Sequence, residues 1–455
     1  MPTDIKKRLL LIASQNAKGC TAAKIKKLNK KISDLQKQAD KIQSDLFLNR
    51  SALEFCELKK RGFSDAKIKS FATQDAKLCS DAQTFIKDNA NLVKRFFGYH
   101  LNLIPESAAV KYMRYLETKI RSVDNCGDTY EDGFFHLTCK HQEQKILDLL
   151  YEHFGISHAD GAWGYLTSGG SESNRWGIEN GVQMLNGGRV YFSAGAHYSV
   201  PKAVQLGPMA NAKQVAVIPH TVIETEKDSE KINVDSLISA VSKNWREKHE
   251  PAVILLTWGT TKTGALDDVE TVIKRLDELK IPRYIHLDAA LYGGLGNGQK
   301  NAPEIPTFKK FDIDSISVSM HKYFGSHEIK SAVIARKKPF ANSVDYISMT
   351  DSTTAGSRGL APFSTYQRIS EIFNRKDAND YNRNIEYFEK MLKANHIWYK
   401  RQGFANIFVI KCPSDAVCHK YELSTFCING KSLAHIMIFP FHKRKFMQEI
   451  ISDIK

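Results

Sequence analysis

The sequence predicts an α/β protein, with a large domain built on a mostly parallel sheet, a smaller α+β domain after it and an additional helical segment in front of it. Three observations favour this fold class. Short apolar runs alternate with helical stretches from about residue 140 onward. Two more apolar runs follow residue 400, and no proline occurs between Pro2 and Pro105. We expect the helical extension at 1–95, the large domain at 96–345 and the small domain at 346–455.

The N-terminal segment is predicted to be helical because it is rich in Ala, Lys, Gln and Leu. Its apolar residues recur at alternating steps of three and four positions, as in a heptad repeat. The seam consists of Ile25, Leu28, Ile32, Leu35, Ala39, Ile42 and Leu46. This spacing predicts a short coiled coil or a helical hairpin.

The same segment carries most of the positive charge. Residues 1–95 contain 21 Lys and Arg against 10 Asp and Glu, which gives them +11 of the chain's formal net charge of +15. One interpretation is a packed helical appendage with a solvated basic face. The other is a docking arm for an acidic partner, a nucleic acid or an anionic membrane. No aromatic interleaving or nucleic-acid-binding motif accompanies the charge.

Composition excludes several classes of protein. No stretch of the 455 residues approaches the ~18 apolar residues that a membrane helix needs. The eight cysteines lack the regular spacing of a disulfide framework, so we expect a globular protein in the reducing cytoplasm. The group Cys412, Cys418, His419 and Cys427 matches no common zinc spacing, and no metal site is expected.

Seven apolar runs are predicted to be strands of the large domain. They are WGYLT (163–167), RVYFS (189–193), QVAVI (214–218), AVILLT (252–257), YIHLD (284–288), SISVS (315–319) and SAVIAR (331–336). In the small domain, NIFVIKCP (406–413) and HIMIFP (435–440) are expected strands, with a closing helix from about His442. Ligands of mostly parallel sheets lie beyond the carboxyl ends of the strands. The residues that end the runs are therefore the candidates for chemistry.

Two of these ends suit a charged ligand. The run at 163–167 is followed by the glycine pair of Ser168–Ser171 and an expected helix, which together offer N–H groups and a hydroxyl to an anion such as phosphate. A tight turn alone would also favour the glycines. Asp288 ends the run at 284–288, and a carboxylate at the end of a buried strand needs a cation or a strong donor.

The other two ends carry a histidine and a lysine. His197 follows the run at 189–193, where a lone histidine is more often structural. Strand alternation in SISVSMHK places Ser319 and His321 on one face, and Lys322 follows them. A lysine there can be a solvated strand terminator. Alongside the other three ends, however, it supplies an amine that can form an imine.

Together the four ends provide a phosphate cradle, a carboxylate that can keep a ring nitrogen protonated, a flat histidine and an imine-forming lysine, as a pyridoxal phosphate site requires. The chain resembles the group II pyridoxal-phosphate-dependent amino-acid decarboxylases, in particular the bacterial-type histidine decarboxylases and the related plant-type serine decarboxylases. The resemblance covers about Phe97 to Lys455. It rests on NCGD (125–128), WGYLTSGGSESN (163–174), HYSV (197–200), GTTKTGALDDV (259–269), HLDAALYGG (286–294), SVSMHKYFGS (317–326), DYIS (345–348) and GSRG (356–359).

The resemblance implies fold type I of the pyridoxal-phosphate-dependent transferases, with a seven-stranded sheet in the large domain. It also implies that Lys322 carries the cofactor as a Schiff base, that Asp288 pairs with the pyridine nitrogen and that His197 stacks on the ring. The remaining expected cofactor contacts are Ala290 at the other ring face, Gly170, Ser171, Ser319 and His321 at the phosphate, and Thr260 near the ring oxygen.

The implied reaction is decarboxylation of an amino acid, in which carbon dioxide leaves and a proton returns to the α-carbon. Tyr346 is the expected proton donor by resemblance, and a tyrosine packed at a domain hinge is the competing interpretation. Histidine is the first expected substrate and another polar amino acid, such as serine, is its rival. A homodimer with both chains at each site is also implied. The alternative function is a catalytically silent docking protein that acts through the basic helices.

Three departures from the family pattern limit the substrate prediction. FGSHEIKSAV places His327, Glu328 and Lys330 where histidine decarboxylases have an apolar stretch with proline and cysteine. Tyr292 stands where a small residue is usual. FFGYHLNLIPESAAV differs in spacing from the family's tyrosine-proline turn. Each departure is expected to alter the pocket or the dimer interface.

Overall fold

The computed structural model describes residue 12 and residues 21–120, 123–205, 217–294, 301–354, 357–375 and 379–455. The chain divides into two compact units, Met1–Ala90 and Asn91–Lys455. The first unit contains a helical hairpin, and the second contains every strand that the described residues form.

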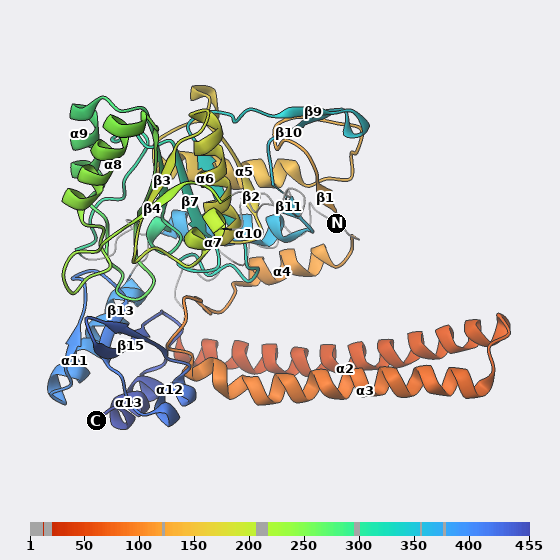
Figure 1. Ribbon diagram of the computed structural model, residues 1–455. Helices are drawn as coiled ribbons and strands as arrows, with labels where there is room; N and C mark the ends of the chain where they lie inside the picture. Colours follow the sequence, from red (N-terminus) through yellow and green to blue (C-terminus); the bar gives the residue numbers. More distant parts are fainter. Residues whose placement is uncertain are drawn as a thin grey trace. The chain divides into compact units, whose positions relative to one another are not determined.

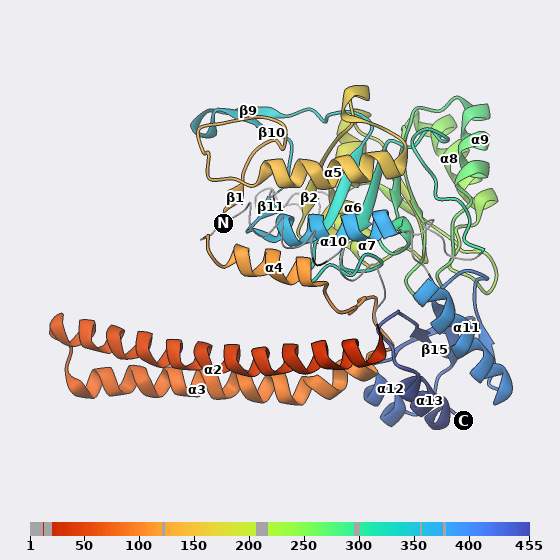
Figure 2. The same cartoon turned by 180° about the vertical axis from the view of Figure 1, so that it is seen from behind.

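The N-terminal hairpin consists of α2 (Ala22–Lys60) and α3 (Asp65–Leu92), which lie side by side in both views (Figures 1 and 2). The Thr21 hydroxyl caps α2 by accepting from the Lys24 N–H, and Gly62 turns the chain with φ of 88°. The helical hairpin is therefore one of the two predicted forms. The large heptad side chains from Ile25 to Leu46 remain 39–63% exposed, so the single chain does not bury the seam.

Seven strands form the large sheet in the order β2-β8-β7-β6-β5-β3-β4. Their bounds are β2 (Trp163–Thr167), β3 (Arg189–Ser193), β4 (His220–Ile223), β5 (Ala252–Thr257), β6 (Arg283–Asp288), β7 (Ser315–Ser319) and β8 (Ser331–Ala335). Four neighbouring pairs are parallel, whereas β8 runs antiparallel to both β7 and β2. The predicted mostly parallel, seven-stranded α/β architecture is confirmed.

One strand was predicted in the wrong place. The run QVAVI was expected to be a strand at 214–218, but Val217 and Ile218 lie outside any strand and 214–216 fall outside the described residues. The strand is β4, which begins at His220, two positions after the end of the predicted run, and forms the edge of the sheet beside β3. An edge strand needs less apolar content than a central one, so the apolar run was a poor marker. Val222 of β4 is accordingly 52% exposed.

Apolar side chains cover both faces of the large sheet. Along β5, Ile254 and Leu256 belong to one buried cluster, and Val253 and Leu255 belong to another. Helices packed on the first cluster are α5 (Lys140–Phe154), α8 (Val234–Lys248), α9 (Val269–Leu279) and α10 (Ala361–Arg375), whereas α6 (Gly170–Met184) and α7 (Ser199–Gln205) pack on the second. Strands buried on both faces often read as continuous apolar runs, as β5 does, whereas β7 was recognised by its alternation of serine with apolar residues, and six of the seven were identified correctly.

A second, antiparallel sheet follows the large one, in the order β12-β13-β15-β14. Its strands are β12 (Tyr399–Lys400), β13 (Ile407–Lys411), β14 (Ser424–Ile428) and β15 (Lys431–Met437). The helices α11 (Asn379–Ala394), α12 (Asp415–Tyr421) and α13 (Arg444–Asp453) lie beside it (Figure 1). The predicted strands at 406–413 and 435–440 correspond to β13 and the end of β15, and α13 is the expected closing helix.

The remaining elements connect these layers. The helix α4 (Ala108–Glu117) precedes β1 (Asp124–Asn125), which pairs antiparallel with β11 (Ser357–Arg358). A small hairpin joins β9 (Asn342–Val344) to β10 (Met349–Asp351) through the single turn Asp345–Ile347.

Candidate active site

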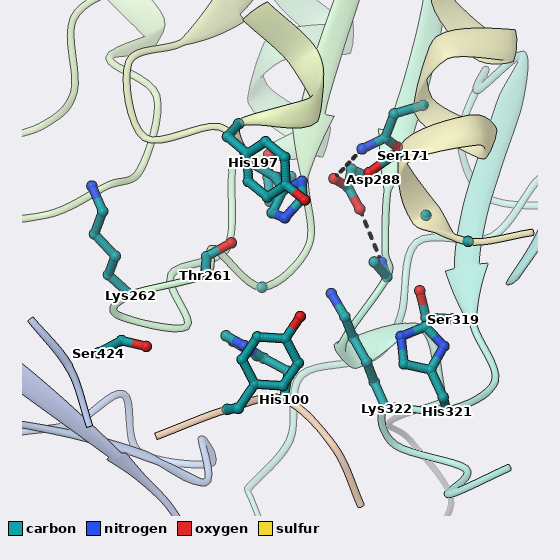
Figure 3. A pocket seen from close by; sticks show the side chains of 18 of the residues that line it. His100, Ser171, His197, Thr261, Lys262, Asp288, Ser319, His321, Lys322 and Ser424 are labelled. Atoms are coloured by element: carbon teal, nitrogen blue, oxygen red, sulfur yellow. Dashed lines mark hydrogen bonds between the residues drawn. The ribbon is translucent and has the colours of Figure 1, made fainter. Parts of the chain in front are cut away.

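The carboxyl ends of the large-sheet strands border one cavity of about 470 Å³ (Figure 3). Thr257, Asp288 and Ser319 are the last residues of β5, β6 and β7, and all three line it. The volume suits a site for a small ligand. The lining contains eight of the predicted site residues, namely Gly170, Ser171, His197, Asp288, Ala290, Ser319, His321 and Lys322.

One end of the cavity forms a polar cradle at the start of α6. The first N–H groups of a helix have no partner within the helix and carry partial positive charge, and here they belong to Gly170 and Ser171. A Cβ added at Gly170 would lie 3.3 Å from Ser319 Oγ and 3.8 Å from Ala290 Cβ. The glycine thus keeps open a space lined by N–H groups and a hydroxyl, which suits a phosphate.

Donors hold the buried carboxylate of Asp288 in place. Its Oδ2 accepts from Asn174 Nδ2 at 2.7 Å and its Oδ1 accepts from the Ala290 N–H at 3.0 Å (Figure 3). Asn174 is fixed in turn, because its Oδ1 accepts from Ser317 Oγ at 2.8 Å and its Nδ2 also donates to Ser199 Oγ at 3.1 Å. Asn174 was not predicted as a site residue. It is the last residue of the stretch SGGSESN (168–174), but nothing in the sequence predicts that it contacts Asp288.

Lys322 and His197 share an environment that favours their neutral forms. Burial lowers the pKa of the Lys322 amine, and the negative charge of Asp288 opposes this shift. A lower pKa enlarges the fraction of neutral amine, which is the nucleophilic form. Burial also lowers the pKa of His197, with Asp288 opposing and Lys322 adding to the shift. A hydrogen bond of 2.8 Å between His197 Nδ1 and Ser199 Oγ orients the ring.

His321 lies beside the cradle as a neutral ring. Burial lowers its pKa to about 4, although the Lys330 carbonyl, 3.0 Å from Nδ1, opposes the shift. A neutral ring that donates Nδ1–H to this carbonyl has a lone pair on Nε2. A phosphate in the cradle would favour the protonated ring, which can donate from Nε2 as well. The predicted contact of His321 with a phosphate would therefore require uptake of a proton.

Thr260 does not lie among the residues that line the cavity, and its predicted contact with the ring oxygen stays a prediction. Its Oγ1 accepts from the Ala265 N–H at 2.9 Å and bonds Thr263 Oγ1 at 3.0 Å, so the hydroxyl stabilises its own turn. The next residue, Thr261, lines the cavity instead. Sequence alone did not distinguish two adjacent threonines in a turn.

Tyr346 does not lie among the residues that line the cavity. It belongs to the turn Asp345–Ile347 between β9 and β10, and its side chain is 76% exposed. This side chain does not pack against its own chain. Within one chain the structure does not bring Tyr346 together with Lys322.

The side of the cavity facing the cradle was not predicted. It contains Tyr99, His100, Thr261, Lys262, Ser424 and His435, which we call the distal wall. Figure 3 shows Thr261, Lys262 and Ser424 on the side away from Ser319 and His321. These residues come from the segment after α3, from the turn after β5 and from the small sheet. Only tertiary packing brings such distant segments together, and the unusual FFGYHLNL stretch was the one available signal.

Two of the three departures from the family pattern now have a physical description. Tyr292 is buried away from the cavity, where its hydroxyl donates to Asn406 Oδ1 at 3.1 Å. His327 is half exposed, 4.0 Å from Glu106. In the same stretch Ile329 lines the cavity, and the carbonyl of Lys330 holds His321. The stretch at 327–330 therefore touches the site, whereas Tyr292 packs against Gly259 in the turn after β5 and against Phe404.

The described residues contain neither a cluster of metal ligands nor a helix that could span a membrane. Within these ranges no three His, Cys, Asp or Glu side chains are grouped so that they could hold a metal ion. Likewise, none of the helices in the described part of the chain is long and apolar enough to cross a membrane.

Comparison with known proteins identifies the family. Residues 179–374 match the model of the pyridoxal-dependent decarboxylase conserved domain. The chain is 30% identical over 364 residues to the histidine decarboxylase of Pseudomonas entomophila (strain L48), covering 77% of this chain and 84% of that protein. It is 33% identical over 328 residues to the histidine decarboxylase of Klebsiella aerogenes, covering 70% and 79%. The chain belongs to the pyridoxal-dependent decarboxylase family.

Solved structures support the fold assignment. L-methionine decarboxylase from Streptomyces sp. 590 superposes with a TM-score of 0.67 at 20% identity, covering 86% of this chain and 95% of that one. Oryza sativa TDC, solved with PLP and tryptamine, superposes with a TM-score of 0.60 at 12% identity, covering 86% and 98%. The fold is that of the type I pyridoxal-phosphate-dependent enzymes.

The protein is accordingly a pyridoxal-phosphate-dependent amino-acid decarboxylase. The cavity fits this cofactor on its own geometry, since a glycine cradle suits the phosphate and a buried carboxylate with fixed donors suits a protonated ring nitrogen. Lys322, which supplies the amine that the chemistry needs, lines the same cavity.

Proposed function

We propose that this decarboxylase acts on L-histidine and releases histamine and carbon dioxide. One observation carries the proposal: the cavity holds Lys322 and Asp288 at one end and a polar distal wall at the other, which leaves room for a polar side chain. The identity to histidine decarboxylases over 77% of the chain supports the same substrate. Serine or another polar amino acid is the rival.

The residues at the cradle end would then have defined tasks. Pyridoxal phosphate, when bound, supplies a conjugated ring that accepts the electrons of the broken bond to the carboxylate. Lys322 would hold it, the cradle of Gly170, Ser171, Ser319 and His321 would bind its phosphate, and Ala290 would leave room at one ring face. Asp288 would keep a proton on the ring nitrogen. His197 would cover the other face and exclude water.

A screen for amines released from amino acids tests this function directly. Purified protein with added pyridoxal phosphate is incubated separately with each of the twenty amino acids, and the amines are identified by mass spectrometry. We expect histamine from histidine, and none from the Lys322→Ala variant. Release of a different amine, again absent in Lys322→Ala, would replace histidine as the substrate and keep the reaction. The absence of any amine from protein that binds the cofactor would contradict the proposal.

We also propose a homodimer in which Tyr346 of one protomer returns the proton at the site of its partner. The exposure of Tyr346 and its position outside the cavity of its own chain support this arrangement. Mixing Lys322→Ala and Tyr346→Phe protomers tests it, because mixed dimers would contain one intact site. Recovery of about a quarter of wild-type activity is expected from random assortment. No recovery from verified mixed dimers would contradict it.

A second function is favoured by the hairpin, whose exposed apolar seam and basic charge suit a docking arm for an acidic partner or an anionic membrane. Deleting residues 1–90 tests this and spares Arg95, which pairs with Glu449 at 2.8 Å. We expect unchanged turnover and loss of binding to phosphatidylserine vesicles or to an acidic protein. Binding that persists in the deleted chain would contradict the docking role, and lost turnover would make the hairpin part of the enzyme.

A further inference from the structure

The position of His100 in the distal wall is fixed from several sides. The Gly98 carbonyl accepts from Ser424 Oγ at 2.9 Å and lies 3.0 Å from His435 Nε2. A Cβ at Gly98 would lie 1.8 Å from the Glu422 carbonyl oxygen, so only glycine permits this close approach. On the other side, the Asn102 side chain donates to the Tyr323 carbonyl at 2.9 Å. The loop that carries His100 is therefore anchored to both the small sheet and the segment after Lys322.

The imidazole of His100 leaves one nitrogen without a partner. The residue is 7% exposed and its side chain lines the cavity. Its Nε2 is buried and has no hydrogen-bond partner among the described residues. The backbone of Thr261 favours a proton on the ring, and because Nε2 has no partner we assign this proton to Nδ1. A neutral ring arranged in this way presents the lone pair of Nε2 as an acceptor.

The surroundings of His100 keep the ring neutral. Burial, and repulsion from Lys322, His435 and His197 whenever these groups are protonated, hold its pKa well below the ordinary value. His435 offers His100 no free ring nitrogen as an acceptor. Its Nδ1 lies 3.2 Å from the Lys262 carbonyl, and its Nε2 lies 3.0 Å from the Gly98 carbonyl. A buried acceptor without a donor costs about 1–3 kcal/mol. A ligand that brings a donor removes this penalty, whereas an apolar or acidic ligand leaves it in place.

We infer that His100 determines substrate specificity by accepting a hydrogen bond at Nε2 from a neutral N–H or O–H donor on the substrate side chain. The inference rests on the proposed decarboxylation of a polar amino acid and narrows its substrate class. The imidazole N–H of histidine and the hydroxyl of serine provide such a donor. Methionine and leucine have none, and the carboxylates of aspartate and glutamate would repel the lone pair.

Binding of unreactive esters tests this inference without turnover. Histidine methyl ester and methionine methyl ester are titrated into the holoenzyme, and the change in the visible spectrum of the cofactor gives each Kd. In the wild type we expect tighter binding of the histidine ester. In His100→Leu the ratio of the two affinities should fall by roughly 10- to 100-fold, because the donor of the histidine ester loses its acceptor. In His100→Gln, which retains an acceptor, the ratio should fall by less than about threefold.

A matched variant controls for general damage to the wall. His435→Leu removes a histidine of the same wall whose nitrogens both face carbonyls, so it should lower thermal stability and weaken both esters alike. The bound-cofactor spectrum verifies that each variant folds. An unchanged ratio in His100→Leu, or an equal fall of the ratio in His435→Leu, would overturn the inference.

The failure of this inference is distinguishable from that of the proposed substrate. If the amine screen identifies serine, the serine and alanine esters replace the first pair, and the ratio in His100→Leu still decides the role of His100. If the best substrate lacks a side-chain donor, the role of His100 is overturned while the decarboxylase activity stands. If histidine is the substrate and the ratio does not change in His100→Leu, only the inference about His100 is wrong.

Discussion

The two ends of the cavity differ in the origin of their residues and in the partners of their polar atoms. At the cradle end the residues follow strands of one sheet, and Asp288 is held by Asn174 and a backbone N–H. At the distal wall the residues come from distant segments, and His100 Nε2 has no partner within the described chain. The hydrogen bonds that already satisfy Asp288 suit a cofactor that remains bound between turnovers. The unsatisfied acceptor of His100 suits a substrate that binds and is released in each turnover.

The largest effect is expected from Lys322→Ala at the cradle end. Removing the amine that would bind the cofactor covalently should lower kcat by at least about 10³-fold. The visible absorbance of the bound cofactor should change at the same time. The exposed Lys202→Ala on α7 serves as a matched control and should behave like the wild type. Substantial turnover in folded Lys322→Ala would break the assignment of the cradle end.

Asp288→Asn should have the next largest effect, because a neutral amide no longer keeps the ring nitrogen protonated. We expect kcat to fall by about 10²-fold or more with a smaller change in KM. Asp267→Asn is the control, since Asp267 is another buried carboxylate and accepts from the backbone of Ile232 and Thr257. The control should lower stability without lowering kcat to the same degree. A change in KM alone in Asp288→Asn would assign the residue to substrate binding.

Asn174→Ala tests whether the network that holds Asp288 matters. The variant removes the 2.7 Å donor to Asp288, so kcat/KM should fall by roughly tenfold, with about 1–3 kcal/mol lost from the free energy of unfolding. Asn180→Ala on the same helix is the matched control, because Asn180 donates to Tyr284 and does not line the cavity. Equal losses of kcat/KM in the two variants would indicate damage to α6.

The smallest effect is expected on the pH dependence of the free energy of unfolding, through a histidine that supports the cradle end. His286 supports Asn174 from 3.2 Å, and burial lowers its pKa to about 4. Below its ordinary pKa of about 6.5 the unfolded chain takes up a proton that the folded chain does not. His286 therefore does not reduce the free energy of unfolding above that pH, and it reduces this free energy progressively as the pH falls towards 4. Urea unfolding should show a loss between pH 7.5 and 5 that is up to about 2 kcal/mol smaller in His286→Gln. An equal loss in both proteins would contradict this.

The same comparison explains what the sequence could predict. Buried strands are recognisable by their apolar residues, and the ends of β6 and β7 lead to Asp288 and Lys322 because ligands bind beyond such ends. The edge strand β4 was misplaced because edge strands need little apolar content. His100 could not be identified because its role depends on a loop that is anchored to Ser424 and, through Asn102, to Tyr323, and both of these partners are far away in sequence. Spacing also does not show that the Thr260 hydroxyl closes a turn while Thr261 lines the cavity.

A double-mutant cycle tests most directly whether the two ends act separately. Values of kcat/KM for the best substrate are measured for the wild type, Asn174→Ala, His100→Leu and the double variant. If the cradle end and the distal wall act independently, the free-energy changes should add within about 0.5 kcal/mol. A coupling energy of about 1 kcal/mol or more would contradict the separation of a cofactor end from a substrate end.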